Sequence, residues 1–590
     1  MTHARFLAGI ALDPASTDRL RAAARELGFV TCIDHPGLVV SVAPGTNILP
    51  LGDDGAVIGT LFSPAMRHAV EAFSPSATTT IVQSAGRHLV HAYWGGYLAI
   101  LRLGPRTILV RPPFGDLPCL LVRMAEGVIA GSDVDLLRAA GARSLSVDYE
   151  AVARQLATGD LRQATTCLTG IEELRGGDCL NVEARAIERT ALWSPWTFVT
   201  SEWRIDDPRE AERRLRDAAI NCVALRTHHL QRPLLLLSGG LDSSVVAACL
   251  AANRRDFACL NAATVNPIGD ERDFARMVAE RIERPLVERL MDGGITGIGQ
   301  LAATRLPRPV ARSFEQRVYQ LATEVADSLG CDGLVDGGGG DNVFGSIQSA
   351  SPAADCLLDP AGRAQFRRLC GDIGALAEAS RWRVAWRAFR RSREAARPFR
   401  WPTDRRYLHP DAPADMAEAV RHPWLDKPGS ALPGRAAHIA MLVAVQAYIE
   451  DGPHGTKQAA VSPLVSQPLI EHCLRIPSWE WFAAGHNRAA ARRAFQRDLP
   501  HDVVWRRGKG TPDGLIVALV ESNRGWIRDH LAGGLLARAG VLNVQMILND
   551  LDDRGPARGT TSGRMLQLAD AESWARGIMA QHDPHPNAPP

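Results

Sequence analysis

Lysine is almost missing from this chain of 590 residues, which has 64 arginines but only Lys427, Lys457 and Lys509. Arginine therefore supplies the ordinary surface cation, and we expect a retained lysine to stand where only a compact ammonium group is suitable. The formal net charge is +2, which argues against a dedicated surface for polyanions. We therefore expect no nucleic-acid partner.

Long apolar runs and paired cysteines are missing too. No stretch approaches the roughly 18 to 20 apolar residues that cross a bilayer, and no signal-type segment is present. We therefore expect a cytoplasmic protein without membrane contact. The eleven cysteines are scattered and include no CxxC pair, which excludes a disulfide framework or zinc site and predicts reduced core thiols such as Cys249.

The apolar pattern of residues 1–200 predicts a layered, sheet-centred α+β domain. Glycine, proline and serine separate short β-type segments, which are expected at residues 56–62, 78–85, 88–104 and 106–115. A helical pattern follows at residues 146–159.

Residues 205–580 have the pattern of a second, α/β domain. After a helix at 208–226, strands at 233–237 and 257–265 alternate with helices at 242–253 and 271–284, and a third strand signal lies within 331–341. Such alternation predicts a doubly wound parallel sheet with crossover helices. Residues 352–575 are mostly helical in pattern, and the tail 581–590 is predicted to be disordered.

Arginines alternate with Trp and Phe in SRWRVAWRAFRRSREAARPFRW, residues 380–401. Phosphate contacts and base stacking use these residue types. The simpler interpretation, which we favour, is an amphipathic helix with its arginines in water and its aromatic rings in the core. If the segment does have a binding function, docking of a peptide or partner protein is the one we expect.

The stretch SGGLDSS, residues 238–244, follows an apolar strand and opens a helix. Such a turn directs backbone N–H groups and the helix dipole at one point, where phosphate binds, and Asp242 can hold a magnesium ion there. A plain strand-to-helix turn with serine caps is the alternative. The residues predicted to contact a nucleotide or its metal are Leu236, Ser238, Gly239, Gly240, Asp242, Ser243 and Ser244.

No GK[ST] follows, so this is not a Walker motif. The stretch instead resembles the pyrophosphate loop of ATP pyrophosphatases, which cleave ATP to AMP and pyrophosphate while adenylating a substrate. That resemblance implies ATP and Mg²⁺ as the cofactors.

A second motif, DGGGGDNVFG at residues 336–345, resembles the second nucleotide motif of the asparagine synthetase family. The resemblance implies that Asp336, Gly337 and Gly339 contact the nucleotide and that Asp341 is the second magnesium ligand beside Asp242. Gly338 stands where asparagine synthetases have the glutamate thought to help deprotonate ammonia. This departure argues against plain asparagine synthesis.

Two further stretches carry the resemblance. LPHDVVWRRGKGTPDG, residues 499–514, is similar to a segment of asparagine and β-lactam synthetases whose lysine stabilises the acyl-transfer transition state, which implies this catalytic role for Lys509. Residues 457–482 most resemble the lasso-peptide cyclases. Nearby Glu450, Asp451 and His454 are polar candidates for the acceptor pocket, although helix-end or turn positions explain them more simply.

The N-terminal half resembles the glutaminase-type half of asparagine synthetases in WGGYLAILR, VRPPFGDLPCLL and VIAGSDVDLL. Those enzymes need a cysteine nucleophile at position 2, where this sequence has Thr2 followed by His3. We therefore expect a retained scaffold that releases no ammonia.

The resemblance implies an ATP-dependent ligase that closes a macrolactam in a lasso peptide. The side chain of an Asp or Glu in a leader-free core peptide would be adenylated, and the N-terminal amine of that peptide would attack it. A leader peptidase and a leader-binding protein are the expected partners. Two alternatives stay open: an asparagine synthetase-like or β-lactam synthetase-like amide ligase acting on a small molecule, and a non-catalytic nucleotide-binding scaffold of a maturation complex.

Overall fold

The computed structural model describes residues 4–53, 55–64, 66, 68–142, 145–183, 186–264, 269–291, 305–310, 312–411, 422–426, 428–429, 431–450, 460–508, 513–553 and 559–580. Lys509, Asp451, His454, Thr2, His3 and the tail 581–590 lie outside these residues, as does the side chain of Glu450.

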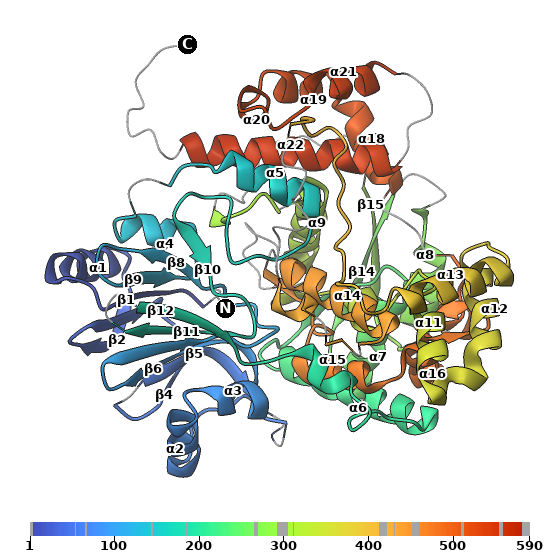
Figure 1. Ribbon diagram of the computed structural model, residues 1–590, viewed down its shortest axis with the longest axis horizontal. Coiled ribbons are helices and arrows are strands. Elements are labelled where there is room, and N and C mark those ends of the chain that lie inside the picture. Colours follow the sequence, from blue (N-terminus) through green and yellow to red (C-terminus); the bar gives the residue numbers. More distant parts are fainter. Residues whose placement is uncertain are drawn as a thin grey trace.

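The N-terminal part contains two antiparallel six-stranded sheets (Figure 1). The first has the order β10-β8-β9-β1-β3-β2, with β1 at Phe6–Ile10, β2 at Val30–His35, β3 at Leu38–Val42, β8 at Leu120–Arg123, β9 at Val128–Gly131 and β10 at Ile171–Glu173. The second has the order β12-β11-β7-β6-β5-β4, with β4 at Ile48–Pro50, β5 at Gly55–Phe62, β6 at Trp94–Leu103, β7 at Arg106–Val110, β11 at Asp178–Glu183 and β12 at Ala186–Ala191.

Alternating residues of the two sheets pack into one core. Phe6 and Val40 of the first sheet share a buried cluster with Ile58 and Leu98 of the second. Helices α1 (Pro14–Glu26) and α4 (Val134–Ala139) cover the other face of the first sheet. This arrangement confirms the predicted layered α+β architecture.

The strand predicted at residues 78–85 is wrong, because α2 (Pro75–Gln83) occupies most of it. The Ser74 hydroxyl accepts a hydrogen bond from Ala77 N at 3.2 Å, and Pro75 occupies the first helical turn. This cap favours a helix over the β propensity of the three threonines that follow. The start of the strand predicted at 88–104 is likewise helical, in α3 (Arg87–Ala92), and β6 begins only at Trp94.

The second part is built on a parallel five-stranded sheet of order β15-β14-β13-β16-β17. Its strands are β13 at Pro233–Leu236, β14 at Ala258–Thr264, β15 at Leu286–Met291, β16 at Gly333–Val335 and β17 at Ala460–Val461. The chain moves outward from β13 to β15 and then crosses to β16 on the other side of β13. Ligands bind at the carboxyl ends of strands beside such a switch point, and SGGLDSS and DGGGGD follow the two strands that flank it.

Three helices of this part agree with the sequence pattern: α6 (Pro208–Arg226), α7 (Leu241–Ala252) and α8 (Arg272–Arg281). Helix α9 (Ser313–Leu329), which packs against β13, β14 and β16, was not predicted. Residues 340–580 are mostly helical, as predicted, with α10 at Gly340–Val343, α11 at Ser351–Leu358, α12 at Phe366–Leu376, α13 at Arg381–Arg393, α14 at Pro433–Glu450, α15 at Gln467–Arg475, α16 at Ala489–Phe495, α17 at His501–Val504, α18 at Asp513–Ser522, α19 at Arg524–Ala532, α20 at Leu535–Arg538, α21 at Val544–Asp552 and α22 at Gly559–Ala580. A short hairpin, β18 (Phe482–Ala483) and β19 (His486–Asn487), precedes α16.

The orientation predicted for the aromatic residues of α13 is wrong. Trp382, Trp386 and Phe389 are exposed, and the buried side chains of this helix are Val384 and Ala388. Small residues at this spacing let α13 lie close to its neighbours, which leaves the large rings on the outer face. Further along, Phe399 and Trp401 do pack against the core.

A buried cluster of charges joins the two parts of the chain. The Glu173 carboxylate, at the end of β10, binds Arg111 Nη1 at 2.9 Å, Arg162 Nε at 3.1 Å and Arg308 Nη1 at 2.5 Å. Arg308 also donates to the carbonyl of Thr165 at 2.8 Å. One carboxylate thus connects both sheets of the N-terminal part to the segment that precedes α9.

Ten of the eleven cysteines are buried, which confirms their predicted position in the core. Burial raises the pKa of Cys249 well above its usual value. Among the described helices, none has both the length and the apolar composition of a membrane span.

Candidate active site

The SGGLDSS turn is shaped by close packing at Gly239. This residue has φ +79°, in the left-handed region that favours glycine, and a Cβ atom there would lie 2.8 Å from both Ala275 N and Phe274 Cβ of α8. Gly240 precedes α7 and carries no capping side chain. The first N–H groups of this helix are therefore available to an anionic ligand.

The serines of the SGGLDSS turn form hydrogen bonds mainly with other residues of the same turn. Ser238 Oγ lies 3.1 Å from Ser243 Oγ and accepts from Gly240 N at 3.2 Å. Ser244 is fully buried and donates to the Gly240 carbonyl at 2.7 Å. Of the three serines predicted to bind a nucleotide, only Ser238 is exposed, whereas Ser244 stabilises the turn. Leu236, also predicted, ends β13 and is half-buried.

The glycines of DGGGGD allow this second loop to lie directly against the first. A Cβ atom on Gly337 would lie 2.5 Å from Ser243 N, and one on Gly340 would lie 2.6 Å from Asp242 Cβ. Gly339, at φ +72°, has no space for a side chain beside Val465. The two loops therefore form one compact unit, which explains the glycines physically.

Asp242 and Asp341 converge on a single cation, the guanidinium of Arg488. Arg488 Nη1 lies 2.9 Å from Asp242 Oδ1, 3.1 Å from Asp242 Oδ2 and 2.5 Å from Asp341 Oδ1. The side chains of Arg488 and Asp242 are only 8% and 10% exposed, whereas that of Asp341 is 39% exposed. The pair is thus buried on one side and open to solvent on the other.

Arg488 is held by its own local structure. It follows the β18–β19 hairpin with φ +55° and precedes the first residue of α16. Burial alone would lower the pKa of Arg488, but the charges of Asp242 and Asp341 outweigh it and raise the pKa. The guanidinium therefore stays charged and neutralises the two carboxylates.

This donor set fits a magnesium ion. Mg²⁺ prefers hard oxygen ligands and is usually held by one or two carboxylates together with substrate phosphates. Asp242 and Asp341 supply two such carboxylates around a point that already attracts a cation. No group of three or more His, Cys, Asp and Glu side chains with metal-binding geometry occurs among the described residues, so phosphate and water would complete the coordination.

Asp336 occupies a separate, buried position on the second loop. Its carboxylate accepts hydrogen bonds from Tyr319 Oη at 2.6 Å, Ser462 Oγ at 2.7 Å and Gly338 N at 2.8 Å. Burial raises its pKa above the ordinary value, although these hydrogen bonds oppose the shift. The carboxylate therefore joins α9, the second loop and the segment after β17.

The segment before Lys509 is anchored beside the first loop. Arg506 Nη1 binds Glu271 Oε1 at 2.6 Å, and the Arg506 guanidinium lies 3.9 Å from the Phe274 ring centroid. Glu271 and Phe274 are also neighbours of Gly239. The contacts of Arg506 therefore hold the chain beside the SGGLDSS turn, two residues before the described segment ends at Gly508.

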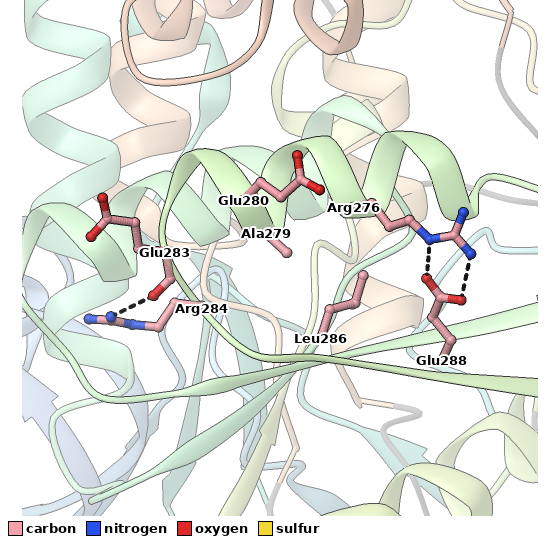
Figure 2. A pocket seen from close by; sticks show the side chains of 7 residues that line it. All are labelled: Arg276, Ala279, Glu280, Glu283, Arg284, Leu286 and Glu288. Carbon is pink, nitrogen blue, oxygen red and sulfur yellow. Dashed lines mark hydrogen bonds and ion pairs between the residues drawn. The ribbon is translucent and has the colours of Figure 1, made fainter.

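A shallow hollow of about 330 Å³ lies elsewhere, between the second half of α8 and β15 (Figure 2). Arg276 Nε binds Glu288 Oε1 at 2.6 Å at one end of the group of lining residues, and Ala279 of α8 and Leu286 of β15 also line the hollow. The residues predicted to bind nucleotide are not among those that line it.

Comparison with known proteins assigns the second part of the chain. The profile of the asparagine synthase family matches residues 214–576, more than half of the sequence, and includes both loops, Arg488 and Lys509. The chain belongs to the asparagine synthase family.

One curated relative of this asparagine synthase family member is the carboxyethyl-arginine β-lactam-synthase of Streptomyces clavuligerus, 29% identical over 212 residues. The alignment covers 35% of this chain and 39% of the relative, so the chain matches well under half the length of that protein.

Two solved structures show a weak similarity to this chain. The glutamine phosphoribosylpyrophosphate amidotransferase of B. subtilis with ADP and GMP gives a TM-score of 0.20 at 9% identity, over 43% of this chain and 65% of that one. An allosteric regulatory enzyme of purine biosynthesis gives 0.22 at 8% identity, over 49% and 80%. Scores this low do not establish a common fold.

The sequence pattern alone missed three residues of this site: Arg488, Tyr319 and Ser462. Arg488 lies 246 positions after Asp242, so no local spacing connects them. Its one available signal is the stretch HNRAAARR, in which Arg488, Arg492 and Arg493 flank three alanines without an acid among them. Buried arginines need acidic or carbonyl partners from elsewhere.

Proposed function

We propose that this family member is an ATP-dependent amide ligase that activates a carboxylate as an acyl-adenylate. The carboxylate oxygen attacks the α-phosphorus of ATP and pyrophosphate leaves. An amine then attacks the acyl carbon, the C–N bond forms, and AMP leaves with the former carboxylate oxygen. The proposal rests mainly on one observation: Asp242 of the first loop and Asp341 of the second loop both contact Nη1 of Arg488.

In this proposal the chain positions the phosphates between the two loops. The N–H groups at the start of α7 bind phosphate oxygens, and Asp242 and Asp341 hold Mg²⁺, which neutralises phosphate charge when bound. The family resemblance implies that the ammonium of Lys509 stabilises charge that develops during acyl transfer.

The proton of the attacking amine needs an acceptor, and Gly338 provides no side chain for this. Asp341 is assigned to the metal, which leaves Asp336 as the other acid of the second loop. Its raised pKa suits a carboxylate that takes a proton from an ammonium-like intermediate. Tyr319 and Ser462 hold the carboxylate in place.

The substrate we propose is a leader-free lasso-peptide core, closed to a macrolactam through an Asp or Glu side chain and the N-terminal amine. The resemblance of residues 457–482 to the lasso-peptide cyclases supports this. In the fold, Ser462 of that segment donates a hydrogen bond to Asp336 of the second loop. Both reacting groups belong to one molecule, so orientation supplies much of the rate. A leader peptidase and a leader-binding protein are the partners of such a reaction.

A β-lactam-type ligase acting on a small molecule is the second candidate. It is supported by the similarity to the Streptomyces clavuligerus β-lactam-synthase, and it would use the same two loops. A non-catalytic scaffold is less well supported, because nothing in a scaffold requires two carboxylates to converge on a cation site.

The experiment incubates the full chain with ATP, Mg²⁺ and synthetic core peptides that carry Asp or Glu at position seven, eight or nine, followed by mass spectrometry. We expect AMP and a peptide lighter by one water. A parallel reaction replaces the peptide with single amino acids that carry an additional carboxylate. AMP formed only with these small molecules would favour the small-molecule ligase, and no AMP with either substrate class would favour the scaffold. Asp341→Asn and Lys509→Arg should each abolish product, and Asp217→Asn, a change at an exposed position of α6, is the matched control.

A further inference from the structure

Helix α13 presents three large aromatic side chains to solvent. Trp382 is 73% exposed, Trp386 is 59% exposed and Phe389 is 50% exposed. They are spaced four and three residues apart, so they lie on one face of the helix. The stripe extends over two helical turns, about 10 Å at the α-helical rise. Exposed rings in a row are costly to leave in water and mark interaction surfaces.

The helix is firmly held from its other side. Val384 and Ala388 are buried and belong to the main hydrophobic core. Ser380 caps the helix by accepting from Arg383 N at 3.3 Å. The aromatic stripe is therefore presented by a fixed helix that needs no rearrangement to meet a partner.

Arginine guanidinium groups lie over all three rings. Arg381 lies 5.2 Å from the Trp382 ring centroid, and Arg390 lies 5.9 Å from that of Trp386. Arg393 lies 4.6 Å from the ring centroid of Phe389. These cation–π contacts restrict the rings and place positive charge directly beside an apolar surface.

The charge of α13 is one-sided. The helix contains six arginines and no acidic residue. The described acid at its end is Glu394, whose Oε1 lies 3.6 Å from Arg390 Nε and 3.3 Å from Arg397 Nη1. The surface therefore complements a partner that carries several negative charges together with apolar side chains.

We infer that the exposed face of α13 is a docking site for an acidic, amphipathic peptide segment of a partner protein. Trp and Arg are the residue types that dominate protein–protein hot spots, and leucine or phenylalanine side chains would pack between the rings while Glu or Asp pairs with the arginines. Nucleic acid is less favoured, because a net charge of +2 gives little long-range attraction for a polyanion. The inference is independent of the reaction that the chain catalyses.

A peptide array tests this site with the full chain. Twelve-residue peptides vary acidic content and apolar content independently, and bound protein is quantified at low and high salt. We expect the strongest binding to peptides that are both acidic and apolar, weaker binding at high salt, and at least a tenfold loss in the variant W382S/W386S/F389S. The charge-reversal variant R390E/R393E, which changes two of the arginines that lie over the rings, should lose binding to acidic peptides in the same way.

The control variant is Trp526→Ser, which removes a partly exposed tryptophan from α19 and should bind the array like the unmodified protein. Binding that depends on charge alone, or is unchanged in W382S/W386S/F389S, would overturn the inference. So would tighter, α13-dependent binding of a single-stranded oligonucleotide, or self-association that the triple variant abolishes.

Discussion

Replacing Arg488 with methionine removes the cation between Asp242 and Asp341 while keeping a long side chain at that position. The two carboxylates would then face each other without compensation on the buried side of the site. Removing one partner of a buried ion pair costs about 3–5 kcal/mol, and the 39% exposure of Asp341 allows solvent to screen part of this. We therefore expect Arg488→Met to lower the free energy of unfolding by about 3 kcal/mol.

Magnesium should restore most of this loss. In the variant the two carboxylates form an anionic site without a competing guanidinium, so Mg²⁺ binds the folded chain more tightly. A ligand at 100 times its dissociation constant stabilises the folded state by about 2.7 kcal/mol. In the unmodified protein Mg²⁺ has to compete with Arg488. Without nucleotide, Mg²⁺ should therefore raise the free energy of unfolding of that protein much less.

The assay follows urea unfolding of both proteins across a Mg²⁺ titration, with no nucleotide present. Arg493→Met is the matched control, because Arg493 lies in α16, directly after Arg488, but pairs with Glu212 and Glu480. We expect it to lose stability without any special response to Mg²⁺. If Arg488→Met gains no more from Mg²⁺ than the control does, the assignment of a metal site to Asp242 and Asp341 is refuted.

Four further changes test other parts of the structure. Glu173→Ala leaves three buried arginines without their carboxylate and should destabilise the chain by about 3–5 kcal/mol, measured by urea unfolding; no loss would contradict the buried cluster. Gly337→Ala forces a methyl group to within 2.5 Å of the α7 backbone and should abolish ATP–pyrophosphate exchange, whereas Gly371→Ala, with open space around it, should not. Asp336→Asn should keep that exchange but slow amide formation at least tenfold; equal loss of both steps would assign Asp336 to nucleotide binding instead. Burial raises the pKa of Asp355 to about 7, above about 3.9 for the unfolded chain, so the folded state binds more protons between these values; stability should fall as pH rises from about 4 to 7, and Asp355→Asn should make that slope shallower.

Local patterns predicted the parallel sheet well. The helix expected at 208–226 is α6 with the same bounds, and the helix expected at 242–253 is α7 within one residue at each end. Strands β15 and β17 were not predicted. The first has charged residues at Glu288 and Arg289, and the second is only two residues long and forms by pairing with β16.

Local sequence patterns gave the wrong structure where a contact between residues distant in sequence, or the side chain that caps one helix, determines it. Ser74 turns a threonine-rich segment into a helix. In α13, Val384 and Ala388 are buried in the core, whereas the tryptophans are not. The strand-to-helix pattern indicated the first loop and the family resemblance indicated the second, but Arg488 could not be placed beside Asp242 because only the folded chain brings them together.

The most direct test of the proposed chemistry labels the side-chain carboxylate of the core peptide with ¹⁸O and follows the label. With ATP, Mg²⁺ and the full chain, we predict that AMP acquires one ¹⁸O atom while the peptide loses one labelled water equivalent and becomes cyclic. The transfer of oxygen requires that the carboxylate attacked the α-phosphorus. Unlabelled AMP, or ADP in place of AMP, would contradict adenylation of the carboxylate by this chain.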